Sequence, residues 1–242
     1  MQRIALILPI AVLALLVSGC KSAARGHAGP VPDPVLDTGH RRPLPPPNRR
    51  PVARRKVAPK KPVRRVAGVP GDWYPTAGIR KDRWQCIVVH HSASPKDSPE
   101  SMHRYHLSQK KWPNGLGYHF VIGNGVNYPD GAVFVGKRWK QQITGAHCKS
   151  GNGRFFGTWR QRNYFNTHGI GICLIGNFEN NRPTAKQMQS LRRLIAFLTP
   201  EAKINPARVY GHGEITRKTA CPGRLQVAAL RRSSGGINAA AR

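Results

Sequence analysis

Acidic residues are scarce in this sequence. Its 242 residues include 10 Asp and Glu against 40 Lys and Arg, which gives a formal net charge of +30 at pH 7. This imbalance excludes a charge-balanced surface and is extreme for an ordinary enzyme. It indicates a polyanionic neighbour, and the charge alone does not choose among an envelope polymer, an acidic lipid surface and a nucleic acid.

The sequence also lacks an apolar run of comfortable length for crossing a bilayer. The run Ile4–Val17 follows Arg3 and is shorter than the ~20 residues that a spanning helix needs. Small residues follow it, directly before Cys20, and this arrangement resembles a bacterial lipoprotein signal. We therefore expect a signal peptide over residues 1–20, a lipid on Cys20 that anchors the chain to a membrane, and a location in the cell envelope. An uncleaved anchor or an ordinary secretory signal is the alternative.

Apolar periodicity is absent from residue 21 to about residue 72. This segment is instead rich in proline and in basic pairs such as Arg49-Arg50 and Arg64-Arg65. A chain of this composition cannot bury enough apolar surface to offset its ordering entropy, and proline favours extended geometry. We expect a disordered basic linker over residues 21–72. It is either a solvated tether or a contact for anionic envelope polymers.

Residue types that bind zinc occur in two places. His212 and Cys221 lie in one glycine-containing loop, and His90 ends a β-branched run that is typical of a buried strand. A catalytic zinc takes three protein ligands and leaves a fourth position for water. The spacing between His212 and Cys221 fits no short zinc-finger pattern, so each residue taken alone is equally compatible with a structural role.

Five sequence blocks, taken in order, resemble the zinc-dependent N-acetylmuramoyl-L-alanine amidases, a family that includes phage lysozyme-type amidases and peptidoglycan recognition proteins. The blocks are Val88–Ala93, Gly117–Ile122, Gly145–His147, Asn166 with Gly169–Gly176, and His212–Gly223. The resemblance covers roughly residues 80 to 230 and implies that His90, His212 and Cys221 bind Zn²⁺. It also implies hydrolysis of the amide bond between N-acetylmuramic acid and the L-alanine of the stem peptide, with peptidoglycan as the partner.

The resemblance assigns one hydrogen-bond donor for the reaction and leaves the second open. Tyr118 matches a family tyrosine that assists the tetrahedral intermediate. The loop between His212 and Cys221 has one residue more than the usual family spacing. Lys218 is therefore our choice for the second donor, and Thr219 is the close alternative.

Further residues receive roles from the resemblance. It implies that His119, His147 and Asn166 line the groove and contact the substrate, and a structural role is an equal alternative for each of them. Glu214 is a candidate general base, although a solvated or supporting carboxylate is our preferred interpretation, and the base stays unassigned. An oxidising envelope also allows one disulfide between two of three cysteines, namely Cys86, Cys148 and Cys173, and the sequence does not say which pair.

The hydrophobic pattern predicts a single α/β domain over residues 73–231, followed by a flexible tail over residues 232–242. Ser98 and Thr184 are expected to begin helices, and residues 149–167 are expected to form a surface loop near the site. The resemblance implies a mixed central β-sheet flanked by helices.

Two other functions compete with zinc hydrolysis. One is a non-catalytic peptidoglycan-binding lipoprotein. The presence of all three ligand types argues against it. The other is nucleic-acid binding, which rests on charge alone and which the export signal and the basic pairs of the tether argue against. We expect a monomer that does not bind nucleic acid.

Overall fold

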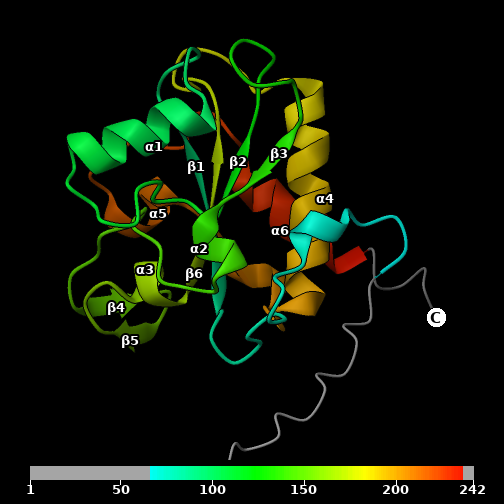
Figure 1. Ribbon diagram of the computed structural model, residues 1–242. Helices are drawn as coiled ribbons and strands as arrows, with labels where there is room; N and C mark the ends of the chain where they lie inside the picture. Colours follow the sequence, from blue (N-terminus) through cyan, green and yellow to red (C-terminus); the bar gives the residue numbers. More distant parts are fainter. Residues whose placement is uncertain (1–65, 237–242) are drawn as a thin grey trace, which may run out of the picture. The chain divides into compact units, whose positions relative to one another are not determined.

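A five-stranded mixed sheet forms the centre of the computed structural model, which describes residues 66–236 (Figure 1). The strands are β1 (Cys86–His91), β2 (Phe120–Ile122), β3 (Val133–Val135), β6 (Gly169–Leu174) and β7 (Val209–Gly211). Their spatial order is β3-β2-β6-β1-β7, in which β1, β2, β6 and β7 are parallel and β3 is antiparallel to β2. This is the mixed sheet that the sequence predicts.

Helices and a small second sheet surround these strands. The helices are η1 (Gly71–Trp73), α1 (Pro99–Ser108), α2 (Lys137–Lys140), α3 (Tyr164–His168), α4 (Ala185–Glu201), η2 (Pro206–Arg208), α5 (His212–Thr216) and α6 (Val227–Gly236), and the second sheet pairs β4 (Gly153–Phe155) with β5 (Thr158–Arg160). The predicted signal peptide with Cys20, most of the predicted linker and the end of the predicted tail lie outside the described residues. None of the helices in residues 66–236 has the length and apolar character needed to cross a bilayer.

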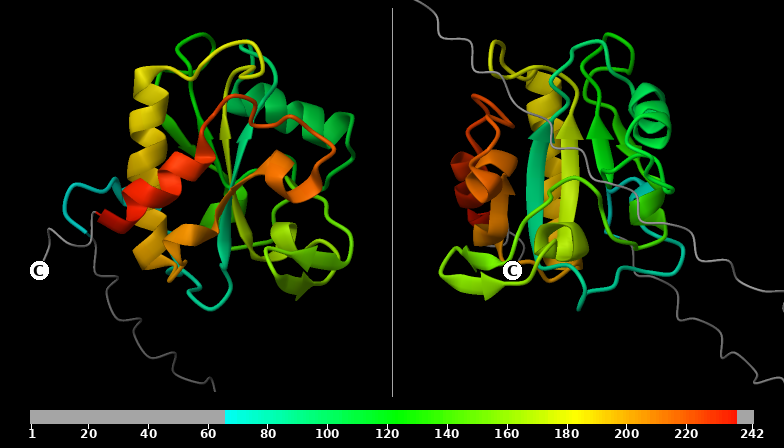
Figure 2. Two further views of the ribbon diagram at one scale, coloured as in Figure 1. Left: turned by 180° about the vertical axis from the view of Figure 1, so that it is seen from behind. Right: turned by 90° about the vertical axis from the view of Figure 1, so that its left-hand side faces the viewer.

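One face of the sheet carries the main hydrophobic core. Alternation along β1 turns Ile87 and Val89 toward this face, where they join buried residues of α4 and α6. α4 contributes the stripe that its helical spacing predicts, with Leu191, Leu194 and Leu198 all fully buried. Figure 1 shows α4 and α1 on opposite sides of the sheet, and the left view of Figure 2 shows α6 crossing the sheet beside α4.

The two helix starts read from the sequence are confirmed by their caps. Ser98 accepts a hydrogen bond from the backbone N–H of Ser101, and the Ser101 hydroxyl completes a capping box before Pro99 begins α1. Thr184 and Gln187 form the same arrangement at the start of α4. Each cap satisfies backbone donors that the first helical turn leaves without partners.

Residues 149–167 are more ordered than the predicted surface loop. They contain the β4–β5 hairpin and most of α3. Phe156 and Gly157 have φ values of 51° and 80° at the tip, which is the geometry of a tight two-residue hairpin turn. The prediction was wrong because three-residue strands are too short to show a period of two in the sequence.

Candidate metal centre

His90 reaches the candidate site through strand alternation. Val88 and His90 point to the face of β1 opposite Ile87 and Val89, away from the main core. The ring of His90 is 1% exposed and lies 4.7 Å from the ring of His212 and 5.2 Å from that of Tyr118, measured between centroids. This face of the sheet therefore holds the site.

His212 and Cys221 are brought to His90 by the strand next to it. β7 pairs with β1 and leads directly into α5, whose first residue is His212. The loop that follows α5 returns to the site, because the Gly213 N–H donates to the Cys221 carbonyl at 2.6 Å. The backbone N–H of His91 then points at the sulfur of Cys221 at 3.3 Å.

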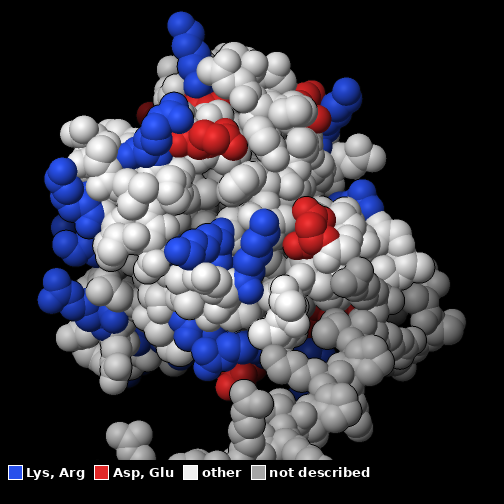
Figure 3. Space-filling model, in the orientation of Figure 1, with Lys and Arg blue, Asp and Glu red and all other residues white. Residues whose placement is uncertain are grey.

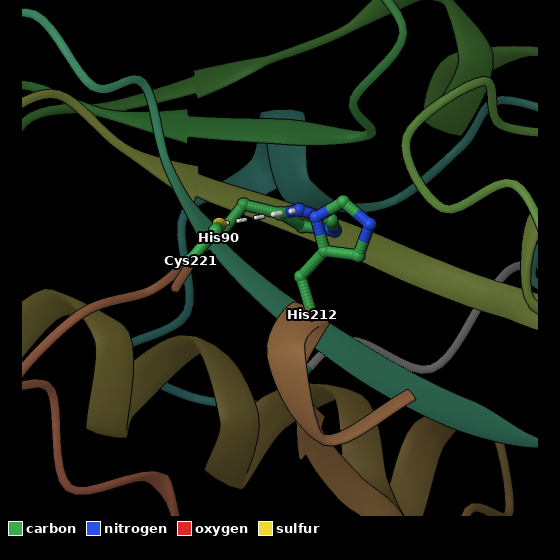
Figure 4. A group of neighbouring side chains, drawn as sticks. All are labelled: His90, His212 and Cys221. Atoms are coloured by element: carbon green, nitrogen blue, oxygen red, sulfur yellow. Dashed lines mark hydrogen bonds between the residues drawn. The ribbon is translucent and has the colours of Figure 1, made fainter. Parts of the chain in front are cut away.

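The three predicted ligands converge in the structure. Ligand atoms of His90, His212 and Cys221 all lie within 4.8 Å of one another, and Figure 4 shows the side chains turned toward a common point. Two imidazole nitrogens and one sulfur are a donor set that zinc accepts readily in a tetrahedral site with one open position. The residues present therefore fit a zinc ion.

A second histidine determines which nitrogen of His90 faces the other ligands. His147 Nε2 lies 3.2 Å from the Gly169 carbonyl, which only accepts hydrogen bonds, so this nitrogen carries the proton in the neutral ring. His147 Nδ1 is then an acceptor, and it lies 3.0 Å from His90 Nε2, which must donate. His90 Nδ1 is left with a free lone pair, and this atom lies 3.8 Å from the sulfur of Cys221.

Two glycines make room for His147. A Cβ atom at Gly145 or at Gly171 would lie 2.4 Å from the His147 ring, a distance that real Cβ atoms do not reach. Gly171 is in β6, beside Val88 of β1. The ring of His147 therefore lies against a strand that has no side chain at that point.

Burial acts in opposite directions on the two ligand types. It lowers the pKa of His90 well below the usual value, helped by His147 and His212, and it also lowers the pKa of His212. Burial raises the pKa of the Cys221 thiol to about 12, against a smaller lowering by the His91 N–H. The imidazoles are thus neutral and ready to bind a metal, whereas the thiol releases its proton when a metal binds.

Tyr118 lies at the edge of this group, two residues before the start of β2. Burial raises its pKa well above the usual value, with the neighbouring thiols of Cys173 and Cys221 adding to the effect. The phenol is therefore protonated at neutral pH. It is available as a hydrogen-bond donor beside the three ligands.

The structure separates the two candidates for the second donor. The Thr219 hydroxyl accepts from the backbone N–H of Cys221 at 3.1 Å, so it lies within the ligand loop and keeps its own proton to donate. Lys218 is exposed and forms no hydrogen bond or ion pair with any part of the chain that the structure describes. Of the two, Thr219 is the one held beside a ligand.

Glu214 is committed to structural contacts. One carboxylate oxygen accepts from the Gly211 N–H at 2.6 Å, and the Arg231 guanidinium donates to the other at 2.7 Å. These contacts fix the start of α5, and His212 with it. The supporting role is the one that this geometry favours.

His119, His147 and Asn166, which the resemblance places at the substrate, each have partners within the protein. His119 is fully buried, and its two ring nitrogens contact the Gly171 N–H at 2.9 Å and the Ile143 carbonyl at 3.1 Å. Asn166 is half-buried, and its side-chain oxygen accepts from the backbone N–H groups of His147 and Cys148, both at 2.8 Å. All three therefore hydrogen-bond to backbone groups around the site, which is a supporting role, and contact with the substrate stays a prediction.

The disulfide that the sequence leaves open is not formed among the described residues. Cys86, Cys148, Cys173 and Cys221 are all free thiols. Cys86 and Cys148 belong to one apolar cluster, whereas Cys173 packs in another with Met102 and Val121. Cys173 is therefore packed apart from Cys86 and Cys148.

Two supporting contacts were not anticipated from the sequence. They are the bond between His90 and His147 and the donation from the His91 N–H to the Cys221 sulfur. The alternating glycines Gly169 and Gly171 in an otherwise apolar strand were the available signal for the first, since alternate glycines leave space on one face. The second involves a backbone group, for which the side chains carry no signal.

Comparison with known proteins identifies the family. The sequence model of Amidase_2, described as N-acetylmuramoyl-L-alanine amidase, matches residues 80–224. The chain belongs to this family. The match includes the three candidate ligands and Tyr118.

Individual relatives match the same part of the chain. Peptidoglycan-recognition protein LB of Drosophila melanogaster is 28% identical over 147 residues, which are 57% of this chain and 53% of that protein. An N-acetylmuramoyl-L-alanine amidase of Sus scrofa is 30% identical over 125 residues, 51% of this chain and 17% of its own length. The chain thus spans about half the length of the first relative and a smaller part of the second.

A solved structure shares the fold. The N-acetylmuramoyl-L-alanine amidase LysC from Clostridium intestinale URNW aligns with a TM-score of 0.51 over 72% of this chain and 95% of its own, at 23% identity. This likeness concerns the fold alone. It agrees with a helix-flanked mixed sheet.

Proposed function

We propose that this chain is a zinc amidase that hydrolyses the bond between N-acetylmuramic acid and the L-alanine of the peptidoglycan stem peptide. One observation carries the proposal. In a chain of the amidase family, His90, His212 and Cys221 direct their ligand atoms to one point, with the protonated Tyr118 beside them. A non-catalytic binding protein needs neither this open ligand set nor the donor.

The protein residues divide the work around the metal. A bound zinc ion would supply an activated water molecule and a polarised carbonyl. Tyr118 donates a hydrogen bond to the oxygen that becomes negative in the tetrahedral intermediate. Thr219 is the better placed second donor, with Lys218 as the alternative, and His147 holds His90 in the tautomer that leaves Nδ1 free.

Metal analysis of single variants tests the ligand set. We expect the purified protein to hold one equivalent of zinc and His90→Ala and Cys221→Ser to lose most of it. Cys148→Ser is the matched control, because Cys148 is a buried free thiol outside the ligand group. Tightly held zinc in both ligand variants would contradict the assignment.

Product analysis tests the bond that is cleaved. Purified wall digested by the protein is expected to yield free stem peptides that begin with L-alanine, together with intact glycan strands. Mass spectrometry distinguishes this result from shortened glycans, and from cut peptides that keep muramic acid attached. Either of these products would contradict the proposed bond. Binding to the wall without any product would show that the protein binds peptidoglycan but does not hydrolyse it.

We also propose that a lipid on Cys20 holds the protein at a membrane of the cell envelope. The support is the small-residue sequence before Cys20 in a chain whose basic linker has no amphipathic face. Cys20→Ser is expected to release the protein from the membrane fraction. High salt screens contacts made by basic residues. If the variant stays in the membrane fraction in high salt, a segment other than Cys20 anchors the protein.

A further inference from the structure

The β4–β5 hairpin presents two aromatic side chains to solvent. Phe156 is 51% exposed and Trp159 is 63% exposed. The ring of Phe156 stacks on that of Tyr210 at 3.9 Å with an interplanar angle of 7°, which holds the hairpin against β7. Trp159 has no aromatic partner within residues 66–236, so a large apolar surface stays uncovered at a fixed place.

A cleft of about 300 Å³ opens beside Trp159, between β5 and α3. Its lining includes Trp159, Arg160, Arg162, Tyr164, Thr167 and His168. The guanidinium of Arg160 lies over the ring of Tyr164 at 4.4 Å, which orients its planar group. Neither Arg160 nor Arg162 forms an ion pair with a carboxylate among the described residues.

The surroundings of this cleft are positively charged. No Asp or Glu occurs between Asp130 and Glu179, a stretch that contains both arginines of the cleft and further Lys and Arg. The lower left of Figure 3, over the β4–β5 hairpin, shows basic side chains and no acidic ones. An anionic ligand would thus meet two arginines that form no ion pair among the described residues.

Both walls of the cleft are attached to the candidate metal centre. The hairpin rests on Tyr210, which precedes His212 by two residues. α3 carries Asn166, whose side chain holds the backbone N–H of His147 at 2.8 Å. A ligand in the cleft would therefore lie on the same side of the sheet as the reacting bond.

We propose that this cleft binds a second repeat unit of the peptidoglycan polymer while the first is cleaved. The apolar face of a sugar ring lies against Trp159, and a carboxylate of the attached peptide pairs with Arg160 and Arg162. This inference rests on the proposed function. A concave site with planar guanidinium groups suits a discrete carboxylate better than a flat acidic membrane, which requires no cleft.

Wall binding by the full-length chain tests the proposal. Each variant is made in a Tyr118→Phe background, which is expected to slow digestion of the wall by about a hundredfold, and binding is measured before product appears. Trp159→Ala and the pair Arg160→Glu/Arg162→Glu are expected to weaken binding to insoluble wall by about tenfold, a usual loss for an interface tryptophan or arginine. The matched control is Arg182→Glu/Arg192→Glu, which makes the same charge change at two exposed arginines outside the cleft. It is expected to bind within about twofold of the parent.

Turnover of a single soluble muropeptide separates the cleft from the catalytic site. With Tyr118 restored, all variants are expected to cleave one repeat unit within about twofold of the parent rate, because one unit occupies only the catalytic position. Unchanged wall binding in both cleft variants would overturn the proposal. An equal loss in the control would also overturn it, by assigning the effect to net charge.

Two further results, on vesicle binding and on muropeptide cleavage by the parent, would decide between the cleft and the proposed function. Loss of binding to phosphatidylglycerol vesicles with wall binding intact would identify the cleft as a membrane contact and overturn the proposal. Failure of the parent chain to cleave the muropeptide would overturn the proposed function. The wall-binding comparison would still decide whether the cleft binds the polymer.

Discussion

At the scale of single residues, His147 fixes the orientation and tautomer of the candidate ligand His90 and lies outside the ligand group. Removing its ring in His147→Ala frees His90 to turn or to expose its protonated nitrogen. Changes of this kind usually cost metal affinity by about ten- to a hundredfold. We expect a loss of this size in a chelator competition with zinc.

His168→Ala is the matched control for this measurement. His168 also contacts a backbone carbonyl, that of Arg83, at 3.0 Å, but it does not touch the ligand group. Its replacement is expected to leave zinc affinity unchanged. Equal affinities of the parent and His147→Ala would show that His90 keeps its orientation unaided.

Replacing Tyr118 is expected to lower turnover and to leave zinc binding unchanged, whereas replacing His147 lowers zinc affinity. Tyr118→Phe removes one hydroxyl beside the metal and no ligand, so zinc content and folding are expected to stay as in the parent. Loss of one donor to an oxyanion costs about a hundredfold in kcat. Steady-state turnover of a soluble muropeptide measures this loss, and a drop of less than about threefold would remove Tyr118 from the mechanism.

At the scale of secondary structure, α5 is held in place by Glu214. Glu214→Gln removes the charge that pairs with Arg231 and weakens the bond to the Gly211 N–H. We expect a loss of roughly 1 kcal/mol in the free energy of unfolding, since the pair is partly exposed. Turnover is expected to stay within a few-fold of the parent, because the amide oxygen of Gln can still accept from the Gly211 N–H and hold the start of α5.

This variant also tests the general-base alternative. A carboxylate that acted as the base would cost at least about a hundredfold in kcat when replaced by an amide. Glu201→Gln, at the end of α4, is a control for loss of one negative charge, as Glu201 forms no ion pair in the described part of the chain. Denaturant titration and turnover of the two variants separate a structural effect from a catalytic one.

The elements that could be predicted from the sequence are those with strong local signals. The buried run before His90, the caps at Ser98 and Thr184 and the apolar stripe of α4 each appear where the pattern places them. The three candidate ligands also lie in one group, as the family resemblance implies. The hairpin of β4 and β5 was missed because its strands are short.

Side-chain direction is what the sequence leaves undetermined. His119 and His147 both looked like groove residues, yet each has its ring nitrogens occupied by partners that are far away in the sequence. The register between β1 and β6 and the missing side chain at Gly171 decide where the His147 ring lies. Such information exists only once the strands are paired.

At the scale of the whole molecule, buried neutral histidines make the domain sensitive to acid. Burial lowers the pKa of six histidines, namely His90, His91, His106, His119, His147 and His212. In the unfolded chain each returns to a pKa near ~6.5. Below that pH the unfolded state binds more protons than the native state, so stability is lost as pH falls. Asp97, whose pKa is raised by burial, acts in the opposite direction but is one group.

We therefore expect the unfolding temperature of the metal-free protein to fall between pH 7 and pH 5. His106 offers the cleanest variant, since its pKa is lowered to about 4 and its ring accepts from the Gly117 N–H at 3.2 Å, away from the ligands. His106→Gln keeps an acceptor and removes the titration, so its stability is expected to vary less steeply with pH. Denaturant titrations at several pH values provide the test, and a stability that rises toward pH 5 would contradict it.

The order in which the ligands leave the ribosome follows from their places in the fold. His90 lies on the first strand of the sheet, whereas His212 and Cys221 follow its last strand. Because a chain is made from its N-terminus, His90 is complete long before its two partners exist. A growing chain therefore carries a single ligand and cannot hold the metal. Under the proposed function, metal uptake would therefore be the closing step of maturation. A chain that stops before Cys221 has every strand of the sheet but lacks one candidate ligand.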